Sequence, residues 1–162
     1  MLYAGMTVED VSSTLRAFTD ALLPIRRAWF QAANVAMDDL DLPSSMSAAI
    51  LMVSRAGPDG IRQNDLAEEV GIHPTALVRV LDQAQKEDIL ARRESQTDRR
   101  VKTIHLLPRG EQLASRIELA ITKLRATLLR DMAPADIEAA TRVLRQFGAH
   151  TAAYLQEARA KR

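Results

Sequence analysis

The sequence predicts a mainly α-helical fold with one small β-hairpin. Apolar residues recur at three- and four-residue steps through most of the 162-residue chain, which is typical of amphipathic helices. Between residues 89 and 106 this period gives way to two strand-like runs that flank a polar, turn-like segment. Just before them, two short helical patterns meet at Gly71. Helix, turn, helix and hairpin in this order indicate a winged helix-turn-helix with additional helices at both ends.

The composition fits a globular subunit without a global charge signature. Hydrophobic residues make up 47% of the chain and aromatic residues only 4%, so aliphatic side chains must fill the core. Since 22 basic and 21 acidic residues give a net charge of +1, any surface for nucleic acid must be local. The absence of cysteine excludes disulfides and thiolate metal sites. We see neither a signal peptide nor an apolar run of about 20 residues, and therefore expect a cytoplasmic protein without a membrane partner.

The first helix is expected to begin after Thr7 as N-cap, with acidic residues in its first turn, and to end near Asp38. Pro24 is a candidate bend. A helix of this length exceeds what a small winged-helix core can cover, so we expect part of its apolar stripe to pack against a second subunit. The stripe consists of Leu15, Phe18, Leu22, Ile25, Trp29, Ala32 and Ala36.

The second helix is expected to follow the break at residues 41–44, with Ser44 or Ser45 as its cap, and to end at the turn of residues 57–60. Ile61 is expected to form a strand of one or two residues.

The next two helices form the predicted helix-turn-helix. The first spans about residues 63–70, and Gly71 follows it where a positive φ is needed. Pro74 suits the first position of the second helix, because a backbone N–H, which proline lacks, would have no partner within the helix there. The inward face of this second helix carries Leu77, Val80, Leu81 and Ala84. Its outward face carries Thr75, Arg79, Asp82 and Gln83.

Two antiparallel strands, at residues 89–93 and 101–106, are expected to enclose a basic loop. A helical pattern resumes after Pro108, and a last helix starts near Pro134. We therefore divide the chain into an N-terminal dimerisation segment (1–42), a winged helix-turn-helix (43–107) and a C-terminal dimerisation segment (108–162).

Several motifs between Gly60 and Gly110 resemble the MarR family of transcriptional regulators. They are Asp65-Leu66-Ala67 with Gly71-Ile72, Leu77-Val78-Arg79-Val80-Leu81-Asp82-Gln83, and Asp98-Arg99-Arg100-Val101-Lys102 before Leu106-Leu107. The nearer likeness is to the SlyA-like branch, and the order of helices fits nearly the whole chain. Two positions depart from the pattern. Asp88 stands where a glycine is common, and aspartate tolerates the left-handed conformation better than most residues. Pro108 replaces a frequent threonine cap, which leaves the start of the fifth helix open.

Arg79 is the main candidate for base recognition. A guanidinium on the outer face of a recognition helix can donate two hydrogen bonds to guanine O6 and N7. The alternative is a solvated arginine, or one paired with Asp82 or Gln83. Pro74 and Thr75 could touch a thymine methyl group or a phosphate, and His73 fits a cap or a phosphate neighbour. Arg62, Gln63 and Asn64 suit phosphate contacts at a helix start, although capping explains them almost as well.

The loop of the hairpin carries the second candidate group. Asp98 can hold one guanidinium in a bidentate pair, and an arginine at the tip can enter a narrow minor groove. The family resemblance implies Arg99 as the inserted residue, with Arg100 and Lys102 nearer the DNA backbone. The alternative is a solvated loop that protects the hairpin edge from aggregation. The local excess of charge favours the functional interpretation, and it comprises Arg92, Arg93, Arg99, Arg100 and Lys102.

A homodimer and a small effector are the expected partners besides double-stranded DNA. The apolar stripes of the first, fifth and sixth helices exceed what a small domain can cover, and the family resemblance also implies a two-fold dimer. It further implies a cleft for small aromatic or anionic molecules, near which we place Arg26, Arg27, Trp29 and Met52, with Met37 and Met46 close by. Plain core packing of Trp29 and the methionines is the alternative.

Neither an enzyme nor a cofactor is expected. The three histidines, His73, His105 and His150, have no partners at metal-ligand spacing, and no phosphate loop or nucleophile motif occurs. We therefore expect a dimeric, sequence-specific DNA-binding regulator, acting as a ligand-responsive repressor on a pseudo-palindrome. The alternatives are a SlyA-like activator that displaces nucleoid proteins and a winged-helix module for protein–protein interaction.

Overall fold

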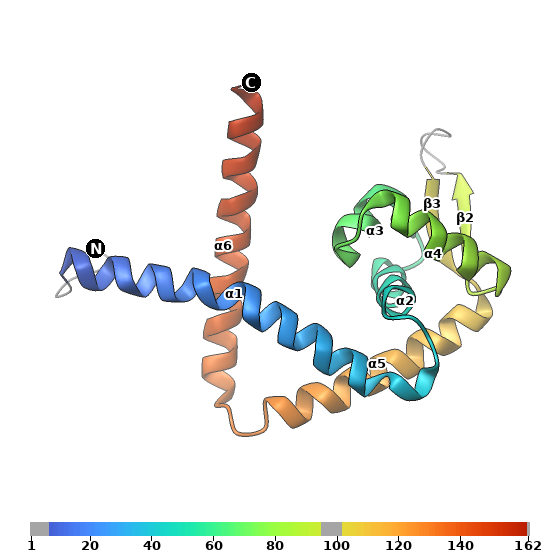
Figure 1. The fold of residues 1–162 in the computed structure, drawn as a ribbon, viewed down its shortest axis with the longest axis horizontal. Helices are drawn as coiled ribbons and strands as arrows, with labels where there is room; N and C mark the ends of the chain where they lie inside the picture. The colour runs from blue at the N-terminus through green and yellow to red at the C-terminus, as the bar shows by residue number, and fades with distance from the viewer. Residues whose placement is uncertain (1–6, 95–101, 162) are drawn as a thin grey trace. The chain divides into compact units, whose positions relative to one another are not determined.

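The computed structural model describes residues 7–94 and 102–161, and it is mainly helical, as predicted (Figure 1). Compact packing divides the chain into two units, Met1–Leu124 and Arg125–Arg162, so the boundary falls within α5. The helices are α1 (Val8–Ala36), the short 3₁₀ helix η1 (Asp38–Leu40), α2 (Ser44–Ala56), α3 (Gln63–Val70), α4 (Pro74–Lys86), α5 (Pro108–Leu128) and α6 (Pro134–Ala160). The strands are β1 (Ile61–Arg62), β2 (Leu90–Glu94) and β3 (Lys102–Leu106).

The start of α1 confirms the predicted N-cap. The Thr7 hydroxyl accepts a hydrogen bond from the backbone N–H of Asp10 at 3.1 Å, and the Asp10 carboxylate accepts one from the Thr7 N–H at 3.1 Å. This reciprocal capping box satisfies two amide groups that the helix itself leaves unpaired. The helix continues through Pro24. Its apolar stripe is only partly covered in the single chain, since Leu15 is 53% exposed and Ile25 65% exposed.

The predicted serine cap of α2 is wrong. The N-cap is Pro43, whose backbone carbonyl accepts hydrogen bonds from Met46 N at 2.9 Å and Ser47 N at 3.0 Å. Ser44 is already the first helical residue, so neither serine precedes the helix as a cap must. The fixed φ of proline suits the entry into the helix, and the loop before it turns at Asp41, where φ is 51°.

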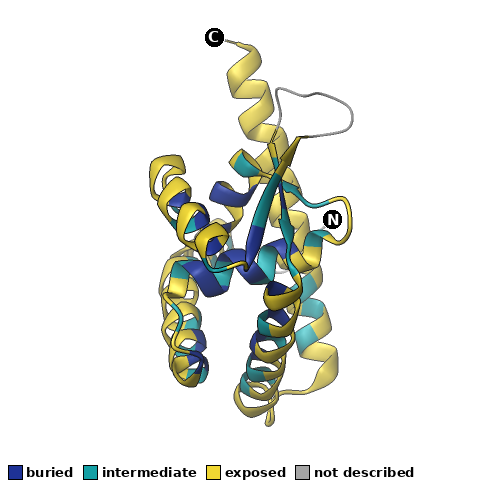
Figure 2. Ribbon diagram, turned by 90° about the vertical axis from the view of Figure 1, so that its right-hand side faces the viewer, coloured by how far each residue is buried: buried dark blue, intermediate teal, exposed yellow. Residues whose placement is uncertain are grey.

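The core lies between α2, α3, α4, the strands and the first part of α5, as the dark blue segments in Figure 2 show. The inward face predicted for α4 is confirmed, since Leu77, Leu81 and Ala84 are buried and Val80 is half-buried. Met46, at 1% exposure, belongs to this core, and Met37 is also buried. Both methionines therefore follow the alternative interpretation as packing residues.

The described residues form a three-stranded antiparallel sheet in the order β1-β3-β2. Ile61 pairs with Ile104, and Arg92 pairs with the same Ile104 from the other side. The short strand predicted at Ile61 is thus present, and it anchors the hairpin to the chain before α3. Asp88 adopts a left-handed φ of 55° at the end of α4, the conformation expected from the resemblance.

The second unit contains the end of α5 and α6. Described along its whole length, α6 contains no buried residue. Its exposed apolar side chains are Val143, Leu144, Phe147, Tyr154 and Leu155. A helix with this many exposed apolar residues is typical of one that packs against a partner. Within the described ranges, no helix combines the length and the apolar character needed to span a bilayer.

Candidate nucleic-acid interface

The turn between α3 and α4 is built by local sequence chemistry. Gly71 ends α3 with a φ of 74°, and its N–H donates to Ala67 O at 3.0 Å. The next helix starts at Pro74, and the His73 ring nitrogen Nδ1 accepts from Thr75 N at 3.3 Å. His73 is therefore the N-cap, one of the two roles predicted for it. This cap fixes the direction in which α4 leaves the turn.

The residues predicted at the two helix starts lie at the surface. His73, Pro74 and Thr75 are exposed, as are Arg62 and Asn64, whereas Gln63 is half-buried. Arg62 is the N-cap residue of α3 and also pairs with Thr103 through β1. Backbone pairing therefore fixes where the start of α3 lies relative to the sheet.

Arg79 lies on the exposed face of α4, and both partners of the alternative interpretation are engaged elsewhere. Asp82 forms an ion pair with Arg92 at 2.7 Å, and Gln83 donates a hydrogen bond to Glu87 at 3.0 Å. Within residues 7–94 and 102–161, the Arg79 side chain is exposed and its guanidinium forms no hydrogen bond or ion pair with these neighbours. An exposed guanidinium on a helix face is the arrangement that bidentate recognition of guanine requires.

At the base of the hairpin, Lys102 has an ion-pair partner that the sequence alone does not reveal. Lys102 pairs with Glu94 across the two strands, and its Nζ lies 3.6 Å from a Glu94 carboxylate oxygen. Both side chains are about half exposed, so the pair is screened by water and leaves the lysine accessible. Asp98, Arg99 and Arg100 lie outside the described residues.

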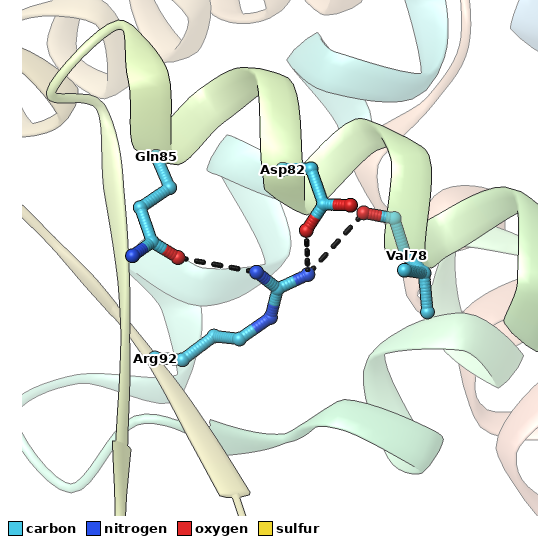
Figure 3. Close-up of polar contacts among 4 residues, drawn as sticks. All are labelled: Val78, Asp82, Gln85 and Arg92. Atoms are coloured by element: carbon cyan, nitrogen blue, oxygen red, sulfur yellow. Dashed lines mark hydrogen bonds and ion pairs between the residues drawn. The ribbon is translucent and has the colours of Figure 1, made fainter.

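Arg92, predicted to belong to the basic cluster at the hairpin, instead forms contacts with α4. Its side chain is only 24% exposed and turns from β2 toward α4, where it contacts Asp82, Val78 and Gln85 (Figure 3). The sequence does not reveal this contact, because no spacing rule joins a strand residue to a helix residue ten positions earlier. Basic composition alone could not separate Arg92 from its neighbours.

His105, on strand β3 of the hairpin, has polar neighbours. Its Nε2 lies 2.9 Å from the Thr103 hydroxyl. Burial, followed by the nearby positive charge of Arg93, lowers the pKa of His105 below its ordinary 6.5, against the opposing effects of the Pro58 carbonyl and Asp59. The imidazole lines a cavity of about 450 Å³ between the end of α2, the hairpin and α5. This site favours a neutral histidine.

The four residues predicted near an effector do not share one environment. The Arg26 guanidinium stacks over the Phe30 ring, 5.1 Å from its centroid, and also lies against Gly71. Trp29 and Met52 are half-buried against the core. Arg27 is exposed. None of these four side chains lines the cavity at His105 or the two other cavities described in the first unit, of about 550 and 520 Å³. An effector site at these residues stays a prediction.

Comparison with known proteins agrees with this geometry. A sequence model described as "MarR family" matches residues 40–101, which hold α2, β1, the helix-turn-helix and β2. The transcriptional regulator PA3341 is 26% identical, with a TM-score of 0.76 over 83% of this chain and 97% of its own. Over its central residues the chain therefore resembles the MarR family. It thus has the fold of transcriptional regulators with a DNA-binding winged helix.

Two further solved structures share the MarR fold at lower identity. MepR from S. aureus, solved with DNA, is 17% identical, with a TM-score of 0.66 over 82% of this chain and 97% of its own. CouR from Rhodococcus jostii RHA1, solved with p-coumaroyl-CoA, is 18% identical, with a TM-score of 0.67 over 78% of this chain and 88% of its own. At these identities the likeness is one of fold. The nearer resemblance to the SlyA-like branch stays a prediction.

Proposed function

We propose that this protein is a cytoplasmic, sequence-specific DNA-binding repressor of the MarR family without enzymatic activity. The observation that carries the proposal is the position of Arg79, exposed on α4 while both of its potential intrahelical partners are engaged elsewhere. In this proposal α4 lies in the major groove, and Arg79 donates two hydrogen bonds to a guanine. Arg62, Gln63, His73, Pro74 and Thr75 contact the phosphates or the neighbouring bases at the two helix starts.

The hairpin supplies the second contact. Arg99 enters the minor groove, Asp98 orients it, and Arg100 and Lys102 approach the DNA backbone. The support is the antiparallel pairing of β2 and β3, the two strands on either side of this segment of the sequence.

The active form in this proposal is a homodimer. Apolar side chains are exposed on both terminal helices, among them Leu23 at 72% on α1 and Leu155 at 48% on α6. Exposed apolar surface on helices that contribute little to the core is typical of a subunit interface. Two-fold symmetry then places two recognition helices about 34 Å apart, so that they read two halves of a pseudo-palindrome.

In this proposal, a small aromatic or anionic ligand releases the repressor from DNA. CouR with its bound CoA thioester shows that a protein of this fold accepts such a molecule. A ligand lowers DNA affinity only if it binds better to a dimer whose recognition helices are wrongly spaced for DNA. Arg26 is a candidate coupling residue, because it reaches from α1 to Gly71 in the turn of the helix-turn-helix.

The salt dependence of DNA binding tests the proposal. Fluorescence anisotropy of a labelled duplex should show an affinity that falls steeply with salt, with a log–log slope of about −0.9 per phosphate contact. The double variant Arg99→Ala with Arg100→Ala should bind more weakly and reduce that slope by up to about 2. An affinity for DNA that is weak and insensitive to salt would instead favour a protein-interaction module.

A further inference from the structure

One arginine connects the hairpin to the recognition helix by three contacts. Arg92 projects from β2, and its Nη2 lies 2.7 Å from Asp82 Oδ1 and 3.2 Å from the Val78 carbonyl oxygen. Its Nη1 donates to Gln85 Oε1 at 3.1 Å. Figure 3 shows the guanidinium lying along the helix between the three acceptors. We call these four residues the Arg92 clamp.

The three acceptors lie on one stripe of α4. Residues 78, 82 and 85 are separated by four and three positions, so they follow one another along the same side of the helix. Arg79 and Gln83 each follow one of them directly in sequence. A change in the orientation of this stripe relative to β2 would therefore also change where Arg79 lies relative to the hairpin loop.

The clamp also neutralises an unfavourable charge. Asp82 belongs to the outward face of α4, and its side chain is 53% exposed. A carboxylate on a face that meets phosphates repels them, and the Arg92 guanidinium compensates for that charge through a short ion pair. The guanidinium is thereby occupied, which makes Arg92 a poor candidate for direct phosphate contact.

We propose that Arg92 is a positioning residue for DNA recognition, which holds the hairpin in a fixed orientation against α4 through Asp82, Val78 and Gln85. This inference rests on the proposed DNA-binding function. In it the recognition helix and the hairpin meet the major and minor grooves as one rigid unit, and Arg92 contributes without touching DNA.

Other contacts hold the hairpin in the core, which allows the role of Arg92 to be measured in a folded protein. Leu90 and Ile104 are buried in the core, at 1% and 0% exposure, and Ile89 N donates to Ala84 O at 2.8 Å. Because these contacts remain, loss of the Arg92 side chain should leave the fold and the thermal midpoint nearly unchanged, whereas DNA affinity should fall.

A double-mutant cycle tests the clamp. Affinity for a selected operator duplex is measured across a range of salt for the wild type, Arg92→Ala, Asp82→Asn and the double variant, with circular dichroism as a check of folding. Arg92→Ala should weaken specific binding about tenfold without changing the salt slope, because no phosphate contact is lost. In the Asp82→Asn background the same substitution should weaken binding only about threefold or less, since the ion pair that the two residues share is already lost.

Two further variants distinguish the clamp from a general loss of charge. Arg92→Lys keeps a positive charge near Asp82 but lacks the second nitrogen that reaches Gln85, so it should restore only part of the affinity. Arg55→Ala is the matched control. Arg55 pairs with Glu118 at 3.3 Å, joins α2 to α5 and takes no part in the proposed DNA surface. The DNA affinity of Arg55→Ala should stay within about twofold of the wild-type affinity.

Three results would overturn the inference. A salt slope reduced by about 1 in Arg92→Ala, with the same loss in both Asp82 backgrounds, would show that Arg92 contacts a phosphate directly. Wild-type affinity in Arg92→Ala would show that the clamp has no role in binding. If the wild type selects no operator at all, the proposed function fails, and this inference fails with it. In the first two cases the proposed function stands.

Discussion

Gly110, in the first turn of α5, lies directly against the carbonyl oxygen of Ile89. A Cβ at this position would collide with that backbone oxygen and would lie 3.1 Å from Leu106 Cδ2. The same carbonyl accepts a hydrogen bond from Leu107 N at 2.9 Å, so it cannot move away without losing that bond. This contact connects the start of α5 to the junction between α4 and the hairpin.

Gly110→Ala should therefore destabilise the protein by about 1–3 kcal/mol, because the added methyl group meets backbone in a packed core. Urea unfolding followed by circular dichroism measures the change. Gly148→Ala is the matched control. A Cβ at Gly148 in α6 would have no neighbour within 4 Å, so the higher helix propensity of alanine should raise stability by up to about 1 kcal/mol. Equal effects of the two substitutions would contradict this account of Gly110.

Arg79→Ala should reduce the discrimination between the preferred base pair and its competitors by about 1–3 kcal/mol, because a bidentate contact to guanine is lost. Competition between operator duplexes that differ at single positions measures it. Arg55→Ala, which removes the same charge elsewhere, should leave the preference intact. Unchanged base preference in Arg79→Ala would show that another residue reads the sequence.

His105 should make stability depend on pH. Its pKa is lowered in the folded protein, so the unfolded chain takes up the proton more readily. The stabilising contribution is complete above the unfolded pKa of about 6.5 and is lost as the pH falls toward the lower, folded value. The urea concentration at the unfolding midpoint should therefore decrease as the pH is lowered from about 7.5 to 5.5. The midpoint of His105→Gln should decrease less over the same range, since glutamine does not titrate. Parallel curves for the two proteins would exclude His105 as the source.

Leu144→Glu should weaken self-association. Leu144 lies on α6 and is 48% exposed in the single chain, and a charge placed in an apolar interface is costly to bury. Sedimentation equilibrium should show a dimer for the wild type and a larger share of monomer for the variant. Gln146→Glu adds the same charge two residues further along α6, on a different side of the helix, and should leave the dimer largely intact. A monomeric wild type would refute the proposed dimer.

The parts of this structure that follow local rules could be predicted from the sequence. Gly71 and Pro74 set the end of α3 and the start of α4 through backbone preferences that involve only adjacent residues, and both positions are confirmed. The left-handed φ of Asp88 is expected instead from the family resemblance, because a glycine is common at this position.

The parts that depend on contacts between distant elements could not be predicted. The orientation of Arg92 toward α4 and the lowered pKa of His105 result from the packing of the hairpin against helices α2 and α4. The serine cap expected for α2 is wrong, because the backbone carbonyl of Pro43 accepts the hydrogen bonds of the first helical turn. For Asp98, Arg99 and Arg100, which lie outside the described residues, the assigned roles stay predictions.

Selection of bound sequences from a random duplex pool, with purified protein at moderate salt, shows whether this protein reads DNA by sequence and as a dimer. We predict an enriched inverted repeat whose half-sites lie about one helical turn apart, because a two-fold dimer presents two recognition helices at that spacing. Retention of DNA without enrichment of any sequence, from protein shown to carry no copurified ligand, would contradict the account.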